Sequence, residues 1–251
     1  MSYIYDSDIR ADFGPSTVNS IWTRRTVLAI IGLNTAVFGA WQYASTYKDK
    51  QLKEWLQRNF TVSWTNINQG RYHTLLTSAF SHNQPMHFIF NMVTLHAFGS
   101  VLASSAINPS SLVVMSVSFG VLSSCALLYW LKSKGLDKGK RQIRRGFLQR
   151  PTQSITIYSG LGASGILCGL GAAATCLAPF QRMILAVIPM PLFMCTAVFF
   201  AVDTYFLNKE SQVGHAAHLG GSVAGFAYYL AFLRNHGNGV WPMLRRLVVR
   251  R

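Results

Sequence analysis

Two polar residues stand near the starts of apolar stretches, and together their side chains have the chemistry of a hydrolase. Ser164 lies in the sequence Gly-Ala-Ser-Gly, and His218 lies in Ala-His-Leu-Gly-Gly. A hydroxyl and an imidazole inside an apolar segment are costly unless something pairs with them. A serine whose proton is taken by a histidine is an activated nucleophile. The two residues therefore predict a serine protease that works within a bilayer.

The composition is that of a membrane protein. Half of the 251 residues are hydrophobic, only 12% are charged, and the mean hydropathy is +0.25. The formal net charge is +15, and the basic residues lie in short loops and at the ends of the chain. This placement favours anionic lipid headgroups as partners and argues against nucleic acid, which needs a folded basic surface. The four cysteines lie in apolar segments and are interpreted as small buried hydrophobes.

Six apolar stretches can each cross a bilayer, which needs about 20 residues. They predict one all-α, six-helix membrane domain at 26–233, with both termini on the same side. A loop at 45–84 has an amphipathic stretch that predicts an interfacial helix, and a strongly basic loop covers 132–153. Tails at 1–25 and 234–251 flank the domain. The six predicted spans are 26–44, 85–103, 112–131, 155–177, 183–205 and 213–233.

The polar residues of the even-numbered spans share one register. His87 opens the second span, with Asn91 one turn deeper, while Ser164 and His218 lie early in the fourth and sixth. Even-numbered spans all run in the same direction, so the four residues are expected at one side of the membrane and at similar shallow depth. In the fifth span, Pro189 and Pro191 predict either a mobile gate or a static kink.

Small residues predict how two of these spans approach. The fourth span carries Gly165 and Gly169, and the sixth carries Gly221 and Gly225. Such faces let parallel helices pack closely. Pairing the two faces brings Ser164 within side-chain reach of the sixth span.

At this point the sequence resembles the rhomboid family of intramembrane serine proteases. The resemblance rests on His-Phe-Ile-Phe-Asn at 87–91, Gly-Ala-Ser-Gly at 162–165, and Ala-His-Leu-Gly-Gly at 217–221. Several stretches look most like the mitochondrial, presenilin-associated rhomboid-like branch: Ala-Phe-Ser-His at 79–82, Asp-Thr at 203–204, and His-Ala-Ala-His at 215–218. The resemblance implies a six-transmembrane-helix rhomboid bundle that cleaves single-span membrane proteins. It also implies the mitochondrial inner membrane as location, with a secretory-pathway membrane as the alternative.

The resemblance assigns roles to the four residues. Ser164 would be the nucleophile and His218 the general base and acid. The Ser164 backbone N–H and the side chains of His87 and Asn91 would stabilise the oxyanion. Family members use a Ser/His dyad without a carboxylate, and we therefore expect Asp203, near the end of the fifth span, to be an interface residue. No cofactor is expected.

Some residues remain open at the level of sequence. Many bacterial members carry a tyrosine under the histidine where this chain has Cys168, so a different residue must orient His218. His215 is either a loop contact or a group that tunes the base, and Arg71 either structures the first loop or meets lipid phosphate. His82 and His87 lack a third ligand, which argues against a metal site.

Two functions from different classes fit these residues. The first is an intramembrane serine endopeptidase. The second is a catalytically silent rhomboid-like protein that binds transmembrane clients. The sequence leaves the oligomeric state open. It also leaves the orientation open, because the excess of Lys and Arg on the active-site side predicts a cytoplasmic or matrix site, whereas the resemblance implies the opposite side.

Overall fold

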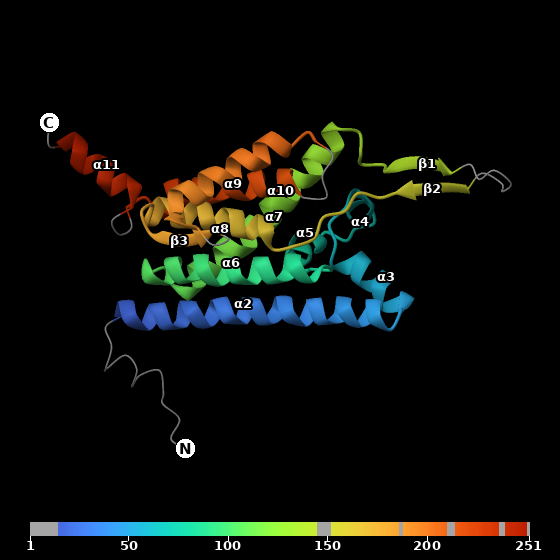
Figure 1. Cartoon of the computed structure of the whole chain (residues 1–251), viewed down its shortest axis with the longest axis horizontal. Coiled ribbons are helices and arrows are strands. Elements are labelled where there is room, and N and C mark those ends of the chain that lie inside the picture. Colours follow the sequence, from blue (N-terminus) through green and yellow to red (C-terminus); the bar gives the residue numbers. More distant parts are fainter. Residues whose placement is uncertain (1–14, 145–151, 186–187, 210–213, 236–238, 250–251) are drawn as a thin grey trace, which may run out of the picture.

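Long apolar helices make up most of the chain (Figure 1). The computed structural model describes residues 15–144, 152–185, 188–209, 214–235 and 239–249. The main helices are α2 (Pro15–Thr46), α6 (Pro85–Ser104), α7 (Pro109–Ser133), α8 (Ser164–Leu177), α9 (Leu192–Phe206) and α10 (His215–Tyr228). A π-helical turn, η2 (Tyr229–Leu233), continues α10, and a further helix, α11 (Val240–Val249), follows it.

The predicted spans correspond to these six helices, with differences at their ends. Four helices are long and apolar enough to cross a membrane, namely Thr17–Thr46, Pro85–Ser104, Pro109–Ser133 and His215–Leu233. The other two, α8 and α9, are shorter apolar helices. The first helix begins well before the predicted start at residue 26. Figure 1 shows the start of α2 and the end of α10 at the same end of the bundle, as the even number of spans predicts.

The prediction of a helix is wrong for about the first third of the fifth span. Residues of that stretch form a short antiparallel hairpin of β3 (Arg182–Leu185) and β4 (Ile188–Pro191), and α9 begins only at Leu192. Pro189 and Pro191 therefore precede the helix and neither gate nor kink it. The physical reason is that proline lacks a backbone N–H and disfavours helical backbone in the residue before it.

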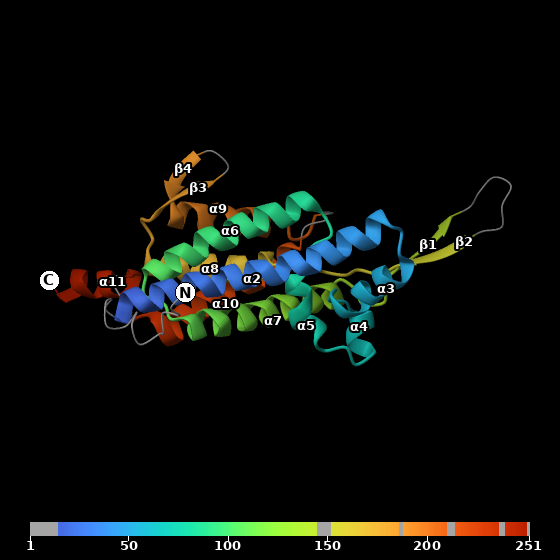
Figure 2. The same cartoon turned by 90° about the horizontal axis from the view of Figure 1, so that it is seen from below.

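The fourth predicted span also starts too early. Residues near its predicted start lie in β2 (Thr152–Thr156), which pairs with β1 (Lys140–Arg144) in a hairpin at the opposite end of the bundle from β3 and β4 (Figure 2). The chain then runs extended, and Gly160 pairs with Val62 of the first loop through two backbone hydrogen bonds of 2.9 and 2.8 Å. Residues 145–151 of the predicted basic loop lie outside the described residues, as do 1–14, 236–238 and 250–251 of the predicted tails.

The first loop contains a helix where the amphipathic stretch predicts one, and its place at the membrane interface stays a prediction. The loop as a whole forms α3 (Lys50–Asn59), α4 (Trp64–Asn68), α5 (Thr74–Thr77) and the 3-10 turn η1 (Ser78–Phe80). In α3, Leu56 is buried and Trp55 is exposed, and the Asp49 side chain caps the helix by accepting the Leu52 N–H at 2.9 Å. Arg71 donates from Nε to Asn66 Oδ1 at 3.0 Å, so it structures this loop.

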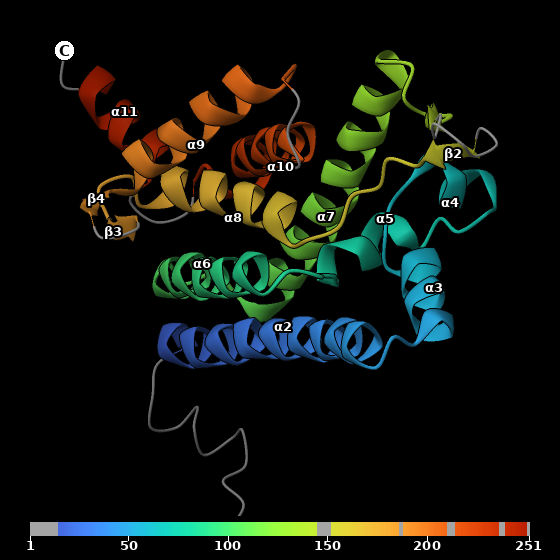
Figure 3. The same ribbon diagram turned by 45° about the vertical axis from the view of Figure 1, so that its right-hand side comes forward.

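Helix α8 lies at the centre of the bundle, and Figure 3 shows it between α6 and α9. Every residue of 165–177 except Cys168 is buried. The predicted glycine faces pair here. A side chain on Gly221 would overlap the backbone oxygen of Gly165, and one on Gly225 would overlap that of Gly169. Because both helices are free of side chains along this line, their backbones come into direct contact.

Candidate active site

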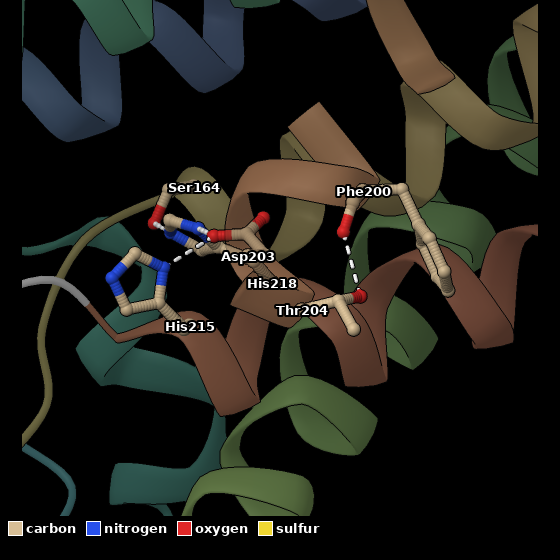
Figure 4. A network of polar contacts seen from close by, with 6 residues as sticks. All are labelled: Ser164, Phe200, Asp203, Thr204, His215 and His218. Carbon is tan, nitrogen blue, oxygen red and sulfur yellow. Dashed lines mark hydrogen bonds and ion pairs between the residues drawn. The ribbon is translucent and has the colours of Figure 1, made fainter. Parts of the chain in front are cut away.

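Ser164 and His218 lie side by side, each near the start of its helix (Figure 4). Ser164 is the first residue of α8, and His218 lies in the first turn of α10. The distance between Ser164 Oγ and His218 Nε2 is 2.7 Å, which is hydrogen-bond contact. Both side chains are partly buried. The close approach of α8 and α10, expected from the glycines, is what brings the hydroxyl to the imidazole.

The loop before Ser164 is held by backbone and side-chain contacts. Gly162 has a φ of +122°, which glycine alone adopts without strain, and its N–H donates to the Ser78 carbonyl at 2.9 Å. The Ala163 N–H donates to Nε2 of His82 at 3.2 Å. This turn ends where α8 begins, so the first backbone N–H groups of α8, which have no partner within the helix, lie next to Ser164 Oγ.

His82 positions the nucleophile loop, a role that its sequence context did not indicate. Its side chain is fully buried, and burial lowers its pKa to about 3, with a smaller contribution from the neighbouring His87. Since Nε2 accepts the Ala163 N–H, the single proton of the neutral ring is on Nδ1. That nitrogen has no hydrogen-bond partner among the described residues.

The two predicted oxyanion residues lie in the first two turns of α6. The His87 ring lies against Gly162, where an added Cβ would stand 2.6 Å from His87 Cε1. Asn91 is buried, and its Nδ2 donates to the His87 carbonyl at 2.7 Å, one turn back along its own helix. The structure therefore brings His87 to the loop of Ser164, whereas the amide of Asn91 is bonded within α6.

Asp203 lies inside the bundle, and the prediction that it is an interface residue is wrong. Its side chain is 7% exposed. Its Oδ1 lies 2.9 Å from His218 Nδ1 and 2.6 Å from His215 Nδ1 (Figure 4). A carboxylate therefore stands next to the candidate base, contrary to the expectation of an acid-free dyad.

The contacts of Asp203 define the tautomer of His218. An ionised carboxylate only accepts hydrogen bonds, so both histidine Nδ1 atoms donate to it. With its proton on Nδ1, neutral His218 has a free lone pair on Nε2 and accepts the hydroxyl proton of Ser164. His215 is thus a buried partner of the Asp203 carboxylate on α9, and its contact extends beyond its own loop.

The direction of the fifth helix was the signal that could have found Asp203. The even helices place their first turns at this end of the bundle, and the odd helices run the opposite way, so they place their last turns there. Asp203 lies three residues before the end of α9. The end of an odd-numbered helix therefore lies at the same depth as His87, Ser164 and His218, and this register includes Asp203.

One described group of side chains has the composition of a metal site. Donor atoms of Cys168, Asp203 and His218 all lie within 4.8 Å of one another. Two of these residues already bond to each other, and His218 also bonds to Ser164. The arrangement therefore favours proton transfer between Ser164 and His218, and the expectation of a metal-free site stays a prediction.

Comparison with known proteins identifies the family of the chain. Residues 69–235 match the family model described as the Rhomboid domain. The chain is 28% identical over 82% of its length to "RHOMBOID-like protein 12, mitochondrial" from Arabidopsis thaliana, covering 58% of that protein. It is 29% identical over 85% of its length to "Rhomboid protein 1, mitochondrial" from Saccharomyces cerevisiae, covering 55%. With "Presenilin-associated rhomboid-like protein, mitochondrial" from Mus musculus, it shares 28% over 84% of its length, covering 51%.

The chain spans a little more than half the length of these relatives. The matched region contains every candidate site residue, from His82 to His218. The mitochondrial relatives and the apolar helices support a multi-pass mitochondrial membrane protein.

Proposed function

The chain belongs to the rhomboid family, and from this premise we propose that it is an intramembrane serine endopeptidase that uses Ser164 and His218. The observation that carries the proposal is the 2.7 Å contact between Ser164 Oγ and His218 Nε2. A hydroxyl this close to an unprotonated imidazole nitrogen is placed for nucleophilic attack with general-base help. The substrates are proposed to be single-span proteins of the mitochondrial inner membrane.

In the first half of the proposed reaction, Ser164 attacks the scissile carbonyl carbon. The Oγ–carbon bond forms as the hydroxyl proton moves to His218 Nε2, and the carbonyl oxygen becomes an oxyanion. His218 then gives this proton to the leaving amine as the carbon–nitrogen bond breaks. The acyl group remains on Ser164 as an ester.

In the second half, water replaces the amine. His218 takes a proton from the water as its oxygen attacks the ester carbonyl, and it returns the proton to Ser164 Oγ as the ester bond breaks. The cleaved substrate leaves as a carboxylic acid, and Ser164 and His218 return to their starting states. The site lies at the first turns of α8 and α10, and this shallow depth allows water to enter.

The oxyanion is proposed to be stabilised from two directions. The backbone N–H of Ser164 stands at the positive end of α8, where negative charge is favoured. The His87 side chain, which lies against Gly162, is the second donor. Asn91 would join them after its amide rotates away from the His87 carbonyl. Donors of this kind act on charge that develops during the reaction, so they raise turnover more than substrate affinity.

The substrate must present an extended segment to Ser164. A transmembrane helix has its backbone groups bonded internally, so cleavage is favoured where helix-breaking residues lie near its end. We expect the scissile bond to lie close to the membrane surface on the side of α3 to α5.

The direct test is cleavage of a single-span reporter by the purified protein in liposomes. The wild-type chain is expected to cleave the reporter, and Ser164→Ala is expected to be inactive. Ser116→Ala is a matched control, because this buried serine of α7 bonds only the Leu112 carbonyl of its own helix in the described structure. Equal cleavage by wild type and Ser164→Ala would overturn the proposal, and no cleavage by either protein would favour the client-binding alternative.

A further inference from the structure

We propose that Asp203 is a positioning residue for His218 and that His215 holds the Asp203 carboxylate in place. Ser164, His218 and Asp203 would then form one continuous chain of hydrogen bonds, and His215 would support it from the other side. The inference rests on the proposed protease function and deepens it, because it assigns two residues that the Ser164/His218 dyad does not include.

The geometry has the order that proton transfer from the serine requires. Ser164 Oγ, His218 Nε2, His218 Nδ1 and Asp203 Oδ1 follow one another through contacts of 2.7 and 2.9 Å. The carboxylate accepts the Nδ1 proton, which keeps Nε2 free to take the serine proton. When it does, His218 becomes an imidazolium ion beside a buried anion, and this ion pair stabilises the charged intermediate. The proton stays on His218, and Asp203 remains ionised throughout.

The burial of Asp203 argues for a function beyond helix packing. An ionisable side chain among apolar helices is costly and is retained where partners satisfy it. Within the described residues, the ion pairs of Asp203 are those with His215 and His218, both to the same oxygen. His215 is itself buried and is the first residue of α10, one turn before His218.

The second histidine therefore has a separate task. Its 2.6 Å contact with Asp203 Oδ1 is the shorter of the two, and it does not involve Ser164. A carboxylate held by one donor can rotate about its bond to Cβ, and a second donor fixes the plane and the position of the accepting oxygen. Loss of His215 is thus expected to loosen Asp203 without removing the charge beside His218.

The neighbouring residue on α9 offers a control in the same turn. Thr204 is exposed, and its Oγ1 donates to the Phe200 carbonyl at 2.7 Å, away from Ser164 (Figure 4). Thr204→Val removes a polar group and a hydrogen bond next to Asp203 but leaves the hydrogen-bond chain intact.

The experiment compares Asp203→Asn, Thr204→Val, His215→Ala and His215→Asn in liposomes, with kcat and KM for the reporter and thermal unfolding measured for each. In a Ser-His-Asp arrangement, an amide in place of the carboxylate favours the wrong tautomer and lowers kcat by about 10⁴-fold. We expect Asp203→Asn to lose about 10²- to 10⁴-fold in kcat with KM nearly unchanged, and Thr204→Val to match wild type. His215→Ala should lose less, and His215→Asn, which keeps a donor, should recover most of that loss.

A second measurement does not depend on peptide cleavage. In the Ser164→Ala protein with ¹⁵N-labelled histidine, NMR should detect the His218 Nδ1–H proton as a hydrogen-bonded signal, and Asp203→Asn should shift it. Wild-type kcat in Asp203→Asn, or loss of thermal stability with unchanged kcat, would overturn the inference while leaving the protease function intact. Equal cleavage by wild type and Ser164→Ala would instead remove the function on which it rests.

Discussion

Gly221 of α10 lies directly against the backbone oxygen of Gly165 on α8, and these two residues flank the candidate active site. Gly165 follows the nucleophile, and Gly221 lies three residues after His218. The contact between the two backbones sets the separation of the two helices at the depth where the serine and the histidine meet. A side chain at Gly221 would meet the Gly165 backbone and move these two helices apart, whereas one at Gly165 would meet Ser123 of α7.

Gly221→Ala is expected to reduce turnover strongly. The added methyl group would overlap the Gly165 oxygen, and the helices can relieve this overlap only by separating. A displacement of about 1 Å between reacting groups can lower the rate about 10²-fold, and overpacking costs roughly 1–3 kcal/mol in stability. Reporter cleavage and thermal unfolding in detergent measure the two effects.

Gly39→Ala is the matched control for this substitution. Gly39 lies on α2, another membrane-spanning helix, and a Cβ there would meet nothing within 4 Å. It should retain wild-type turnover and stability. Full turnover in Gly221→Ala would show that the spacing of the two helices does not control the position of His218.

Substitution of the predicted oxyanion donors should act on kcat. His87→Ala removes a side chain that lies against the loop of Ser164, and the loss of one such donor typically lowers kcat about 10²- to 10³-fold. Asn91→Ala should have the same direction of effect, and KM should change little in both because the donors act on the transition state. Steady-state kinetics with the reporter separate the two parameters.

The alternative for this pair is a structural clasp. Asn91 bonds the His87 carbonyl in the described structure, so a purely structural role would lower thermal stability in Asn91→Ala and leave kcat unaffected. Unchanged turnover in both variants would favour the clasp.

The pH dependence of the free energy of unfolding should report the protonation of His82 when the protein unfolds. The folded state lowers the pKa of this buried ring to about 3 from its ordinary 6.5. Between these two values, the unfolded chain binds a proton that the folded chain does not. The free energy of unfolding therefore falls as the pH is lowered from 6.5 towards 3, by at most about 1.4 kcal/mol per pH unit from this residue, and the full contribution is present above pH 6.5.

His82→Gln isolates this contribution. Glutamine has an oxygen that can accept the Ala163 N–H, but it does not titrate. The variant should lose stability less steeply than wild type over the same pH range in thermal unfolding experiments. Parallel slopes for the two proteins would mean that His82 does not titrate on unfolding.

Several features could be predicted from sequence because they depend on local pattern. Apolar length predicted α6, α7 and α10 to within a few residues, since a stretch of that length and composition has few alternatives in a membrane. The glycine faces predicted the contact of α8 with α10, because small residues at four-residue spacing leave one side of a helix bare. The common direction of the even spans placed Ser164, His218 and His87 at one end.

Errors arose where local pattern is ambiguous. The hydropathy of an apolar stretch is the same whether its backbone is helical or extended, so hydropathy alone does not locate the start of a helix. The predicted fifth span therefore covered β4 and most of β3, and the predicted fourth span began in the last two residues of β2. Backbone preferences of Pro191 and Gly162 decided where α9 and α8 begin.

The sequence by itself determined which residues have hydrolytic chemistry and which end of the bundle holds Ser164 and His218, because both follow from residue type and helix direction. Only the tertiary structure decided what surrounds them. Asp203 reaches His218 across helices, and His82 reaches the Ala163 N–H across 81 residues of chain. Contacts of this kind depend on the rotation of each helix about its axis and on the path of the loops, which packing of the whole bundle fixes and no local pattern encodes.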